Sequence, residues 1–129
     1  MKYNISHPNK IINSTIELPS SKSISNRVLI IKSLLNDSID ISNLSDCDDT
    51  LILKHYLSKL PSVIDVDGGG TPFRFLTSYL SILDGEVFVL TGNERMRKRP
   101  IHGLVESLRS LGADISYIEE YGFAPIRIK

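Results

Sequence analysis

The sequence predicts an α/β fold. Short apolar runs typical of strands alternate with longer stretches in which apolar residues recur every three or four positions, as on an amphipathic helix. The chain has 129 residues, enough for one domain with a core of its own. No G-x-G-x-x-G fingerprint follows the first predicted strand, which argues against a dinucleotide-binding fold.

In the first half, strands are expected at residues 2–6 and 11–18, a helix at residues 22–35 and a strand at residues 39–41. The first helix carries apolar residues at helical spacing, which predicts that they form its core stripe: Ile24, Val28, Ile31 and Leu35. Ser45 or Asp46 is expected to cap a second helix, which Pro61 ends. Its apolar residues are Leu53, Tyr56, Leu57 and Leu60.

In the second half, a strand is expected at residues 63–66, followed by a turn at residues 68–70. Pro72 fits the first turn of a third helix, and a compact strand follows at residues 87–90. Pro100 opens a fourth helix that ends at Gly112. The last predicted elements are strands at residues 115–118 and 125–128, paired as a hairpin.

The segment from Leu18 to Arg27 is typical of an anion site. Its serines can cap the helix that follows, and Ser23 and Arg27 lie four positions apart on one face. Lys22 falls in the first turn, where the helix dipole disfavours a cation by up to about 1 kcal/mol. A charge-assisted hydrogen bond can return about 1.5–3 kcal/mol, so Lys22 suits a helix start that holds an anion. The alternative is a helix start with solvated polar residues.

Other charged groups are open to several interpretations. The basic run at residues 95–99 could be a nucleic-acid patch or a solvated loop, but a formal net charge of zero argues against attraction to nucleic acid or anionic membranes. Asp46, Asp48 and Asp49 could suggest a metal site, although capping of a helix start explains them better.

Cys47 is the single cysteine, which excludes an intramolecular disulfide. The aspartates around it are expected to raise its pKa and make it a poor nucleophile.

No apolar run approaches the length of a membrane span, and no apolar secretion core is present at the N-terminus, so a cytoplasmic location is expected.

Three segments together resemble the EPSP synthase family, in the family's order and with near-family spacing. They are L-P-S-S-K-S-I-S-N-R at residues 18–27, G-G-T-P-F-R-F-L-T at residues 69–77, and L-T-G-N-E-R-M-R-K-R-P-I at residues 90–101, followed by L-G-A-D at residues 111–114. The resemblance covers essentially the whole chain. It departs from the usual family pattern at Ser20, Gly68, Pro72 and Phe73.

The resemblance implies the enolpyruvyl transferase fold, an inside-out α/β barrel. It has two lobes of β-α-β-α-β-β units with helices inside and sheets outside, and the active site lies between the lobes. Family members are several times longer, so this chain is expected to be an N-terminal fragment with an incomplete lobe. Residues 1–19 would join the C-terminal lobe, which is the expected missing partner, and residues 20–129 would begin the N-terminal lobe.

The resemblance also implies a reaction of the shikimate pathway of aromatic amino acid biosynthesis. The family transfers the carboxyvinyl group of phosphoenolpyruvate to shikimate 3-phosphate and needs no metal or cofactor. Lys22 would be catalytic and contact both substrates, Ser23 and Arg27 would bind shikimate 3-phosphate, and Gly70 and Arg99 would bind phosphoenolpyruvate.

The family's catalytic aspartate and glutamate lie in the C-terminal lobe, so negligible turnover is expected of the chain alone. The alternatives are a phosphometabolite-binding module without chemistry and an enolpyruvyl transferase acting on a nucleotide sugar. The run S-K-S-I-S-N-R argues against the second of these. Binding to nucleic acid would show a steep dependence on salt.

Overall fold

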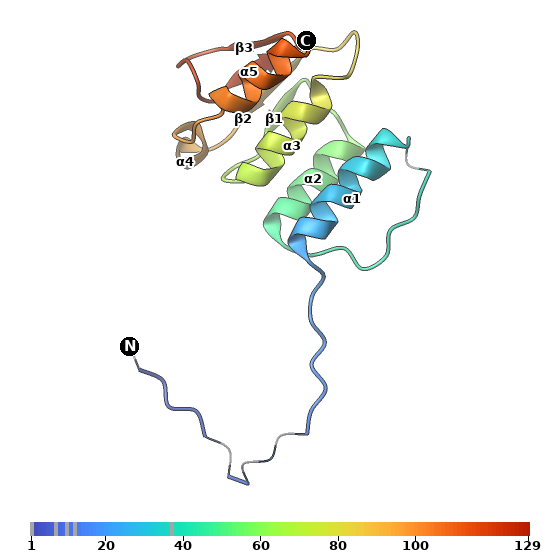
Figure 1. The fold of residues 1–129 in the computed structure, drawn as a ribbon, viewed down its shortest axis with the longest axis vertical. Coiled ribbons are helices and arrows are strands. Elements are labelled where there is room, and N and C mark those ends of the chain that lie inside the picture. The colour runs from blue at the N-terminus through green and yellow to red at the C-terminus, as the bar shows by residue number, and fades with distance from the viewer. Residues whose placement is uncertain (1, 7, 10, 12, 37) are drawn as a thin grey trace.

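A mixed four-stranded sheet with helices packed against it forms the C-terminal half of the chain (Figure 1). The computed structural model describes residues 2–6, 8–9, 11, 13–36 and 38–129. Its elements in chain order are α1 (Lys22–Leu34), α2 (Asp48–Ser58), β1 (Val63–Asp65), α3 (Gly70–Leu80), β2 (Phe88–Thr91), α4 (Glu94–Arg97), α5 (His102–Ser110), β3 (Ile115–Tyr117) and β4 (Ile126–Ile128).

The strand order is β1-β2-β4-β3. Strands β1 and β2 are parallel and are joined by the crossover helix α3, whereas β4 runs antiparallel to both β2 and β3. Ile64 pairs with Leu90, and Leu90 pairs with Ile126, so one apolar row crosses three strands. Apart from the short helix α4, residues 63–128 form one β-α-β-α-β-β unit, which confirms the predicted fold class.

Helix α3 lies at the centre of the core. Phe73, Leu76 and Leu80 are fully buried along one of its faces, as helical spacing requires. They pack in the same cluster as Leu53 of α2 and Val105 of α5. The predicted helices at residues 45–60, 72–83 and 100–112 and the C-terminal hairpin are therefore confirmed, with shifts of a few residues at their ends.

The predicted strands at residues 2–6, 11–18 and 39–41 are not formed by the residues that the structure describes there. Residues 7, 10 and 12 lie outside the described part of the chain. Ile5, Ile16 and Leu18 are exposed, and the N-terminal segment runs away from the folded body (Figure 1). A strand needs a neighbour to satisfy its backbone N–H and C=O groups, and none of these described residues pairs with a strand of the sheet.

The predicted core stripe of α1 was also wrong. Ile24 is 65% exposed, and Ile31 and Leu35 are each 48% exposed. The buried residues of α1 are instead Ser25, Asn26 and Leu29. Because apolar residues surround most of this helix, their periodicity does not decide which face packs against α2.

Two helix starts differ from the prediction. Cys47, not Ser45 or Asp46, is the N-cap of α2, and the Ser45 hydroxyl accepts a hydrogen bond from the Cys47 N–H. Helix α4 was not predicted; the Asn93 side chain caps it by accepting from the Met96 N–H at 3.0 Å. Asp48 and Asp49 lie in the first turn of α2, where the helix dipole favours negative charge.

The central position of Phe73 gives a test of the core. Replacing Phe73 with alanine should lower the free energy of unfolding by about 3–5 kcal/mol, because it removes a fully buried ring and leaves a cavity. Leu111→Ala is the control, since Leu111 is 83% exposed and its loss should cost less than about 0.5 kcal/mol. Urea denaturation of the chain measures both, and equal losses would contradict this packing.

Candidate anion-binding site

The first turns of α1 and α3 meet the loop that follows α4 at a pocket of about 330 Å³. The residues that line it come from three separate segments and are Lys22, Ser23, Asn26, Arg27, Gly70, Thr71, Arg74, Phe75 and Arg99. Every site residue predicted from the sequence is in this set. Two helix N-termini contribute, and their free N–H groups and dipoles favour a bound anion.

Lys22 forms an ion pair with Asp49 of α2, with 3.0 Å between Nζ and the carboxylate. The Lys22 side chain is about half exposed, whereas that of Asp49 is largely buried. The hydrogen bond and the charge of Asp49 raise the pKa of Lys22 above the usual lysine value. Asp49 therefore stabilises the charged form of Lys22 and positions its ammonium group at the pocket.

Arg27 is positioned by its own helix and by α3. Its Nη1 donates to the carbonyl of Ser23 at 2.8 Å, one turn earlier. Its guanidinium lies over the ring of Phe75, with 5.8 Å between Cζ and the ring centre. Only one N–H group of the guanidinium donates in these two contacts, so the other N–H groups can donate to an anion.

Gly70 and Arg99 are in close contact, although 28 intervening residues separate them in the sequence. A Cβ added at Gly70 would lie 2.5 Å from Cζ of Arg99, so only glycine lets the guanidinium pack against this backbone. Helix α4 brings Arg99 here, and the Arg99 N–H donates to the carbonyl of Met96. The contact joins the start of α3 to the loop after α4.

Sequence reasoning missed Arg74. Its guanidinium donates to the carbonyl of Gly70 in its own helix at 3.1 Å and to that of Pro100 at 2.9 Å, so it ties the start of α3 to the loop that carries Arg99. Burial and, to a lesser extent, the charge of Arg99 lower the pKa of Arg74. Its place four residues after Gly70, on the same helix face, was the available signal.

Asn26 was missed as well. It is fully buried, and its Oδ1 accepts a hydrogen bond from the Thr50 hydroxyl at 2.7 Å. Its Nδ2 has no hydrogen-bond partner among the described residues. Beside it, the Ser25 hydroxyl accepts from the Ser45 N–H. This buried polar layer fixes α1 against α2 and so places Lys22 beside Asp49.

Four of the residues that line the pocket are cationic, and none of its described lining residues is acidic. Carboxylates and phosphates are the ligands that such a set binds. The pocket's described lining residues include no histidine or carboxylate for proton transfer. The arrangement can therefore bind and orient anionic substrates.

In the basic run at residues 95–99, Arg97 and Lys98 form ion pairs with acidic side chains outside the pocket. Arg97 forms an ion pair with Glu119 at 3.1 Å and donates to the carbonyl of Gly92, and Lys98 pairs with Glu94. The expectation of solvated side chains is confirmed for Arg95, Arg97 and Lys98, which are exposed, but the expected loop is wrong, since residues 94–97 form the short helix α4. Of the run, only Arg99 lines the anion pocket.

The thiol of Cys47 also departs from expectation. Burial acts to raise its pKa, but hydrogen bonding with Ser45 and Thr50 outweighs burial and the nearby Asp49 charge, and the pKa is lowered.

Among the described residues, no group of three or more histidine, cysteine, aspartate or glutamate side chains is placed to hold a metal ion. The described helices include none with the length and apolarity needed to cross a bilayer.

Comparisons with known proteins show the family to which the chain belongs. The family model for EPSP synthase (3-phosphoshikimate 1-carboxyvinyltransferase) matches residues 6–70 and 54–129. A 3-phosphoshikimate 1-carboxyvinyltransferase of Bacteroides fragilis is 50% identical over 129 residues, which is 100% of this chain and 31% of the relative. One of Shewanella piezotolerans is 38% identical and is matched over 94% of this chain and 34% of its own length.

An EPSP synthase structure from Acinetobacter baumannii superposes with a TM-score of 0.75 at 22% identity, covering 88% of this chain and 31% of that one. At this identity the likeness shows the fold alone. The chain thus spans about a third of the length of the relatives that it matches.

The Lys22–Asp49 pair gives a titration test. Because Asp49 favours the charged form of Lys22, Asp49→Asn should move the Lys22 titration midpoint down towards the ordinary lysine value. The stability that this pair contributes should be complete below the ordinary lysine pKa and be lost as pH rises through the raised one. NMR titration of the Lys22 Cε resonance measures the midpoint.

Asp48→Asn is the matched control, because Asp48 lies one position away but does not contribute to the shift of Lys22. An unchanged midpoint in Asp49→Asn, or equal changes in both variants, would contradict the assigned ion pair.

Proposed function

Because the chain belongs to the EPSP synthase family, we propose that it is the N-terminal portion of a 3-phosphoshikimate 1-carboxyvinyltransferase. In this reaction the carboxyvinyl group of phosphoenolpyruvate passes to the 5-hydroxyl of shikimate 3-phosphate, and phosphate is released. Both substrates are polyanions, which the pocket's cations and helix N-termini suit.

The observation that carries the proposal is the convergence of Lys22, Arg27 and Arg99 on one pocket. They come from three segments of the chain, and like charges repel, so bringing them together is unfavourable unless an anion is bound there. Charge-assisted hydrogen bonds to phosphate or carboxylate oxygens would offset that repulsion. A purely structural role would leave these cations dispersed over the surface.

Within this proposal, Ser23 and Arg27 bind shikimate 3-phosphate, and Gly70, through its backbone N–H, binds phosphoenolpyruvate together with Arg99. Lys22 contacts both substrates and is the catalytic residue of this chain. Its pairing with Asp49 keeps it charged and positioned before the substrates arrive.

The proposal extends to the rest of the polypeptide. Residues 1–19 join strands of the C-terminal lobe, which would explain why those described here extend away from the body. That lobe supplies the acid and base for proton transfer, so the chain alone has negligible turnover. The reaction uses no cofactor, and the enzyme works in the cytoplasm, where its cysteine would stay reduced.

A phosphometabolite-binding module without chemistry is the second candidate. The observation that favours it is the pocket itself, whose described lining residues suit anion binding and include no histidine or carboxylate. The two candidates differ in turnover: only the enzyme portion would release phosphate when the missing two-thirds of the polypeptide is restored.

Restoring that part tests the proposal. In the chimera, this chain replaces the matching third of the Bacteroides fragilis relative, which is 50% identical to it. We expect phosphate release from shikimate 3-phosphate and phosphoenolpyruvate by the chimera and none by the chain alone. Lys22→Met should lower kcat/KM by roughly 10- to 150-fold, the equivalent of one charge-assisted hydrogen bond of about 1.5–3 kcal/mol.

Lys59→Met is the control, because Lys59 is an exposed residue at the end of α2 and should leave the rate unchanged. An active chimera in which Lys22→Met has no effect would refute the role of Lys22. Turnover by the isolated chain would refute the need for the rest of the polypeptide, and a folded chimera that binds both substrates without releasing phosphate would favour the binding module.

Gly70 provides a second test in the chimera. A Cβ at this position overlaps the Arg99 guanidinium, so Gly70→Ala should displace Arg99 and raise the KM for phosphoenolpyruvate at least tenfold. The KM for shikimate 3-phosphate should change much less, because Ser23 and Arg27 remain in place. Gly103→Ala is the control, since nothing lies within 4 Å of a Cβ there. Equal changes in both KM values would contradict the assigned division of the pocket.

A further inference from the structure

Asn26 carries a buried hydrogen-bond donor for which the described residues supply no acceptor. The residue is fully buried, and its Nδ2 is unpartnered in the described part of the chain. Asparagine is seldom fully buried, and a buried donor that has lost its hydrogen bond to water without gaining another destabilises the fold. Such a group in a native protein indicates an acceptor that comes from outside the protein.

The Thr50 hydroxyl sets the orientation of the Asn26 amide. It donates to Oδ1 at 2.7 Å, and Thr50 is itself almost fully buried in α2. A carboxamide is planar and carries its oxygen and nitrogen on different arms of one carbon, so Nδ2 is directed away from that hydroxyl. The donor of Asn26 therefore has a fixed direction, away from α2.

The anion pocket lies beside this donor, since Asn26 is one of the residues that line it. Asn26 follows Lys22 and Ser23 by one helical turn and precedes Arg27, so the four residues lie on one side of α1. All four line the pocket, whereas its other lining residues belong to α3 and to the loop after α4. An acceptor for Nδ2 can therefore come from a ligand bound on the α1 side of the pocket.

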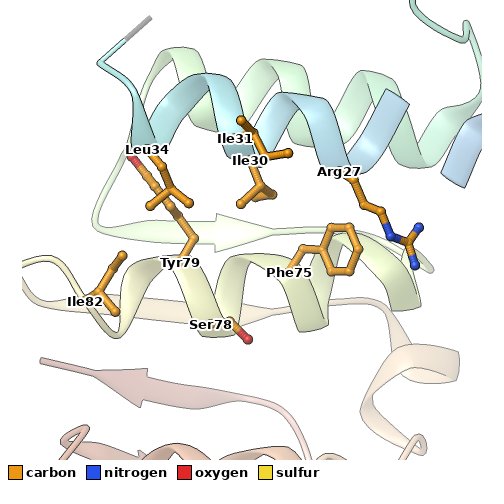
Figure 2. Close-up of a pocket in the computed structure, with 8 residues that line it drawn as sticks. All are labelled: Arg27, Ile30, Ile31, Leu34, Phe75, Ser78, Tyr79 and Ile82. Carbon is orange, nitrogen blue, oxygen red and sulfur yellow. The ribbon is translucent and has the colours of Figure 1, made fainter. Parts of the chain in front are cut away.

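The apolar next turn of α1 limits the donors that this side offers. Beyond Arg27, α1 borders a groove of about 450 Å³ with Ile30, Ile31 and Leu34 (Figure 2). These side chains cannot donate hydrogen bonds. In the direction of the groove, the side-chain donors of α1 thus end at Arg27, with Asn26 directly before it.

We infer that Asn26 is a further substrate-binding residue, whose Nδ2 donates a hydrogen bond to an oxygen of the anion held by Ser23 and Arg27. The identity of that anion as shikimate 3-phosphate rests on the proposed function. Because Nδ2 is buried, the accepting oxygen lies at the floor of the pocket, where a hydrogen bond is stronger than in water.

The amide contributes something that the cations of the pocket do not. Lysine and arginine attract any anion, and their attraction falls off gradually with distance. The neutral amide adds little at a distance, but its hydrogen bond requires an oxygen at one position and along one direction. Asn26 therefore selects how the anion is oriented between Ser23 and Arg27.

Two variants separate the donor from the packing of Asn26. Thr50→Val removes the hydroxyl and leaves Nδ2, whereas Asn26→Leu combined with Thr50→Val replaces both partners with apolar groups of similar size. Replacing both partners of a buried hydrogen bond leaves neither of them unpaired, so the double variant should remain folded. Urea denaturation of the chimera checks that it does.

Binding of shikimate 3-phosphate to the chimera is measured by calorimetry, which requires no turnover. The double variant should raise the Kd at least about tenfold, the effect of losing one hydrogen bond to a charged group. Thr50→Val alone should raise it by less than about threefold, because the donor remains. In an active chimera the KM for phosphoenolpyruvate should stay within about threefold in both variants, because Gly70 and Arg99 remain in place.

An unchanged Kd in the folded double variant overturns the inference. So do equal losses in Thr50→Val and the double variant, since packing of α1 on α2 would then be responsible. If the double variant does not fold, the Asn26 amide is observed by NMR in the chimera labelled with 15N-asparagine, and Thr50→Val identifies its resonance. Saturating shikimate 3-phosphate should move its Nδ2 protons to lower field, and no movement overturns the inference.

The outcome is separable from the proposed function. An active chimera whose affinity for shikimate 3-phosphate does not depend on Asn26 would refute this contact and leave the enzyme assignment intact. A chimera that binds shikimate 3-phosphate through Asn26 but releases no phosphate would support the contact and refute the assignment.

Discussion

The mutual repulsion of the pocket's cations is the constraint on which the site depends. Lys22, Arg27, Arg74 and Arg99 line a single pocket, and each needs a contact that holds it there. Lys22 has the Asp49 carboxylate, Arg27 has the Ser23 carbonyl and the Phe75 ring, and Arg74 has two backbone carbonyls. Arg99 packs against the bare backbone of Gly70. Most of these partners are neutral, so the pocket keeps its positive charge for a ligand.

Helix α3 contributes residues to both the cationic pocket and the hydrophobic core. Its first residue, Gly70, contacts Arg99, while Phe73, Leu76 and Leu80 on the same helix fill the core between the sheet and α2. Arg74 of the same helix donates a hydrogen bond to the carbonyl of Pro100. The helix cannot shift along its axis without disturbing both the packed core and the loop of Arg99. The position of the site is therefore set by core packing.

The sequence predicted the elements whose partners lie within the chain. Residues 63–128 were recognised because β1, β2, β3 and β4 pair with one another and α3 buries a regular apolar face. The described residues of the predicted strands at residues 2–6, 11–18 and 39–41 form no strand, because none of them pairs with β1, β2, β3 or β4. Helix α4 was missed because its start is set by a cap at Asn93 and it is too short to show periodicity. Arg74 was missed because one of its two partners, the carbonyl of Pro100, lies on a loop 26 positions away, which local patterns do not reveal.

The one helix whose buried face was mispredicted is also the helix that carries the anion motif. In α1, the described residues Ser25 and Asn26 are buried and Ile24 and Ile31 are exposed, the reverse of the usual arrangement in a small domain. The polar side is buried because hydrogen bonds to Ser45 and Thr50 fix the register of α1 on α2, and that register brings Lys22 to Asp49. Apolar packing has no such directionality, so an apolar face could slide, whereas this polar layer fits in one register only. The position of Lys22 therefore depends on directional hydrogen bonds of α1 and not on burial of its apolar residues, of which Ile24 and Ile31 stay exposed.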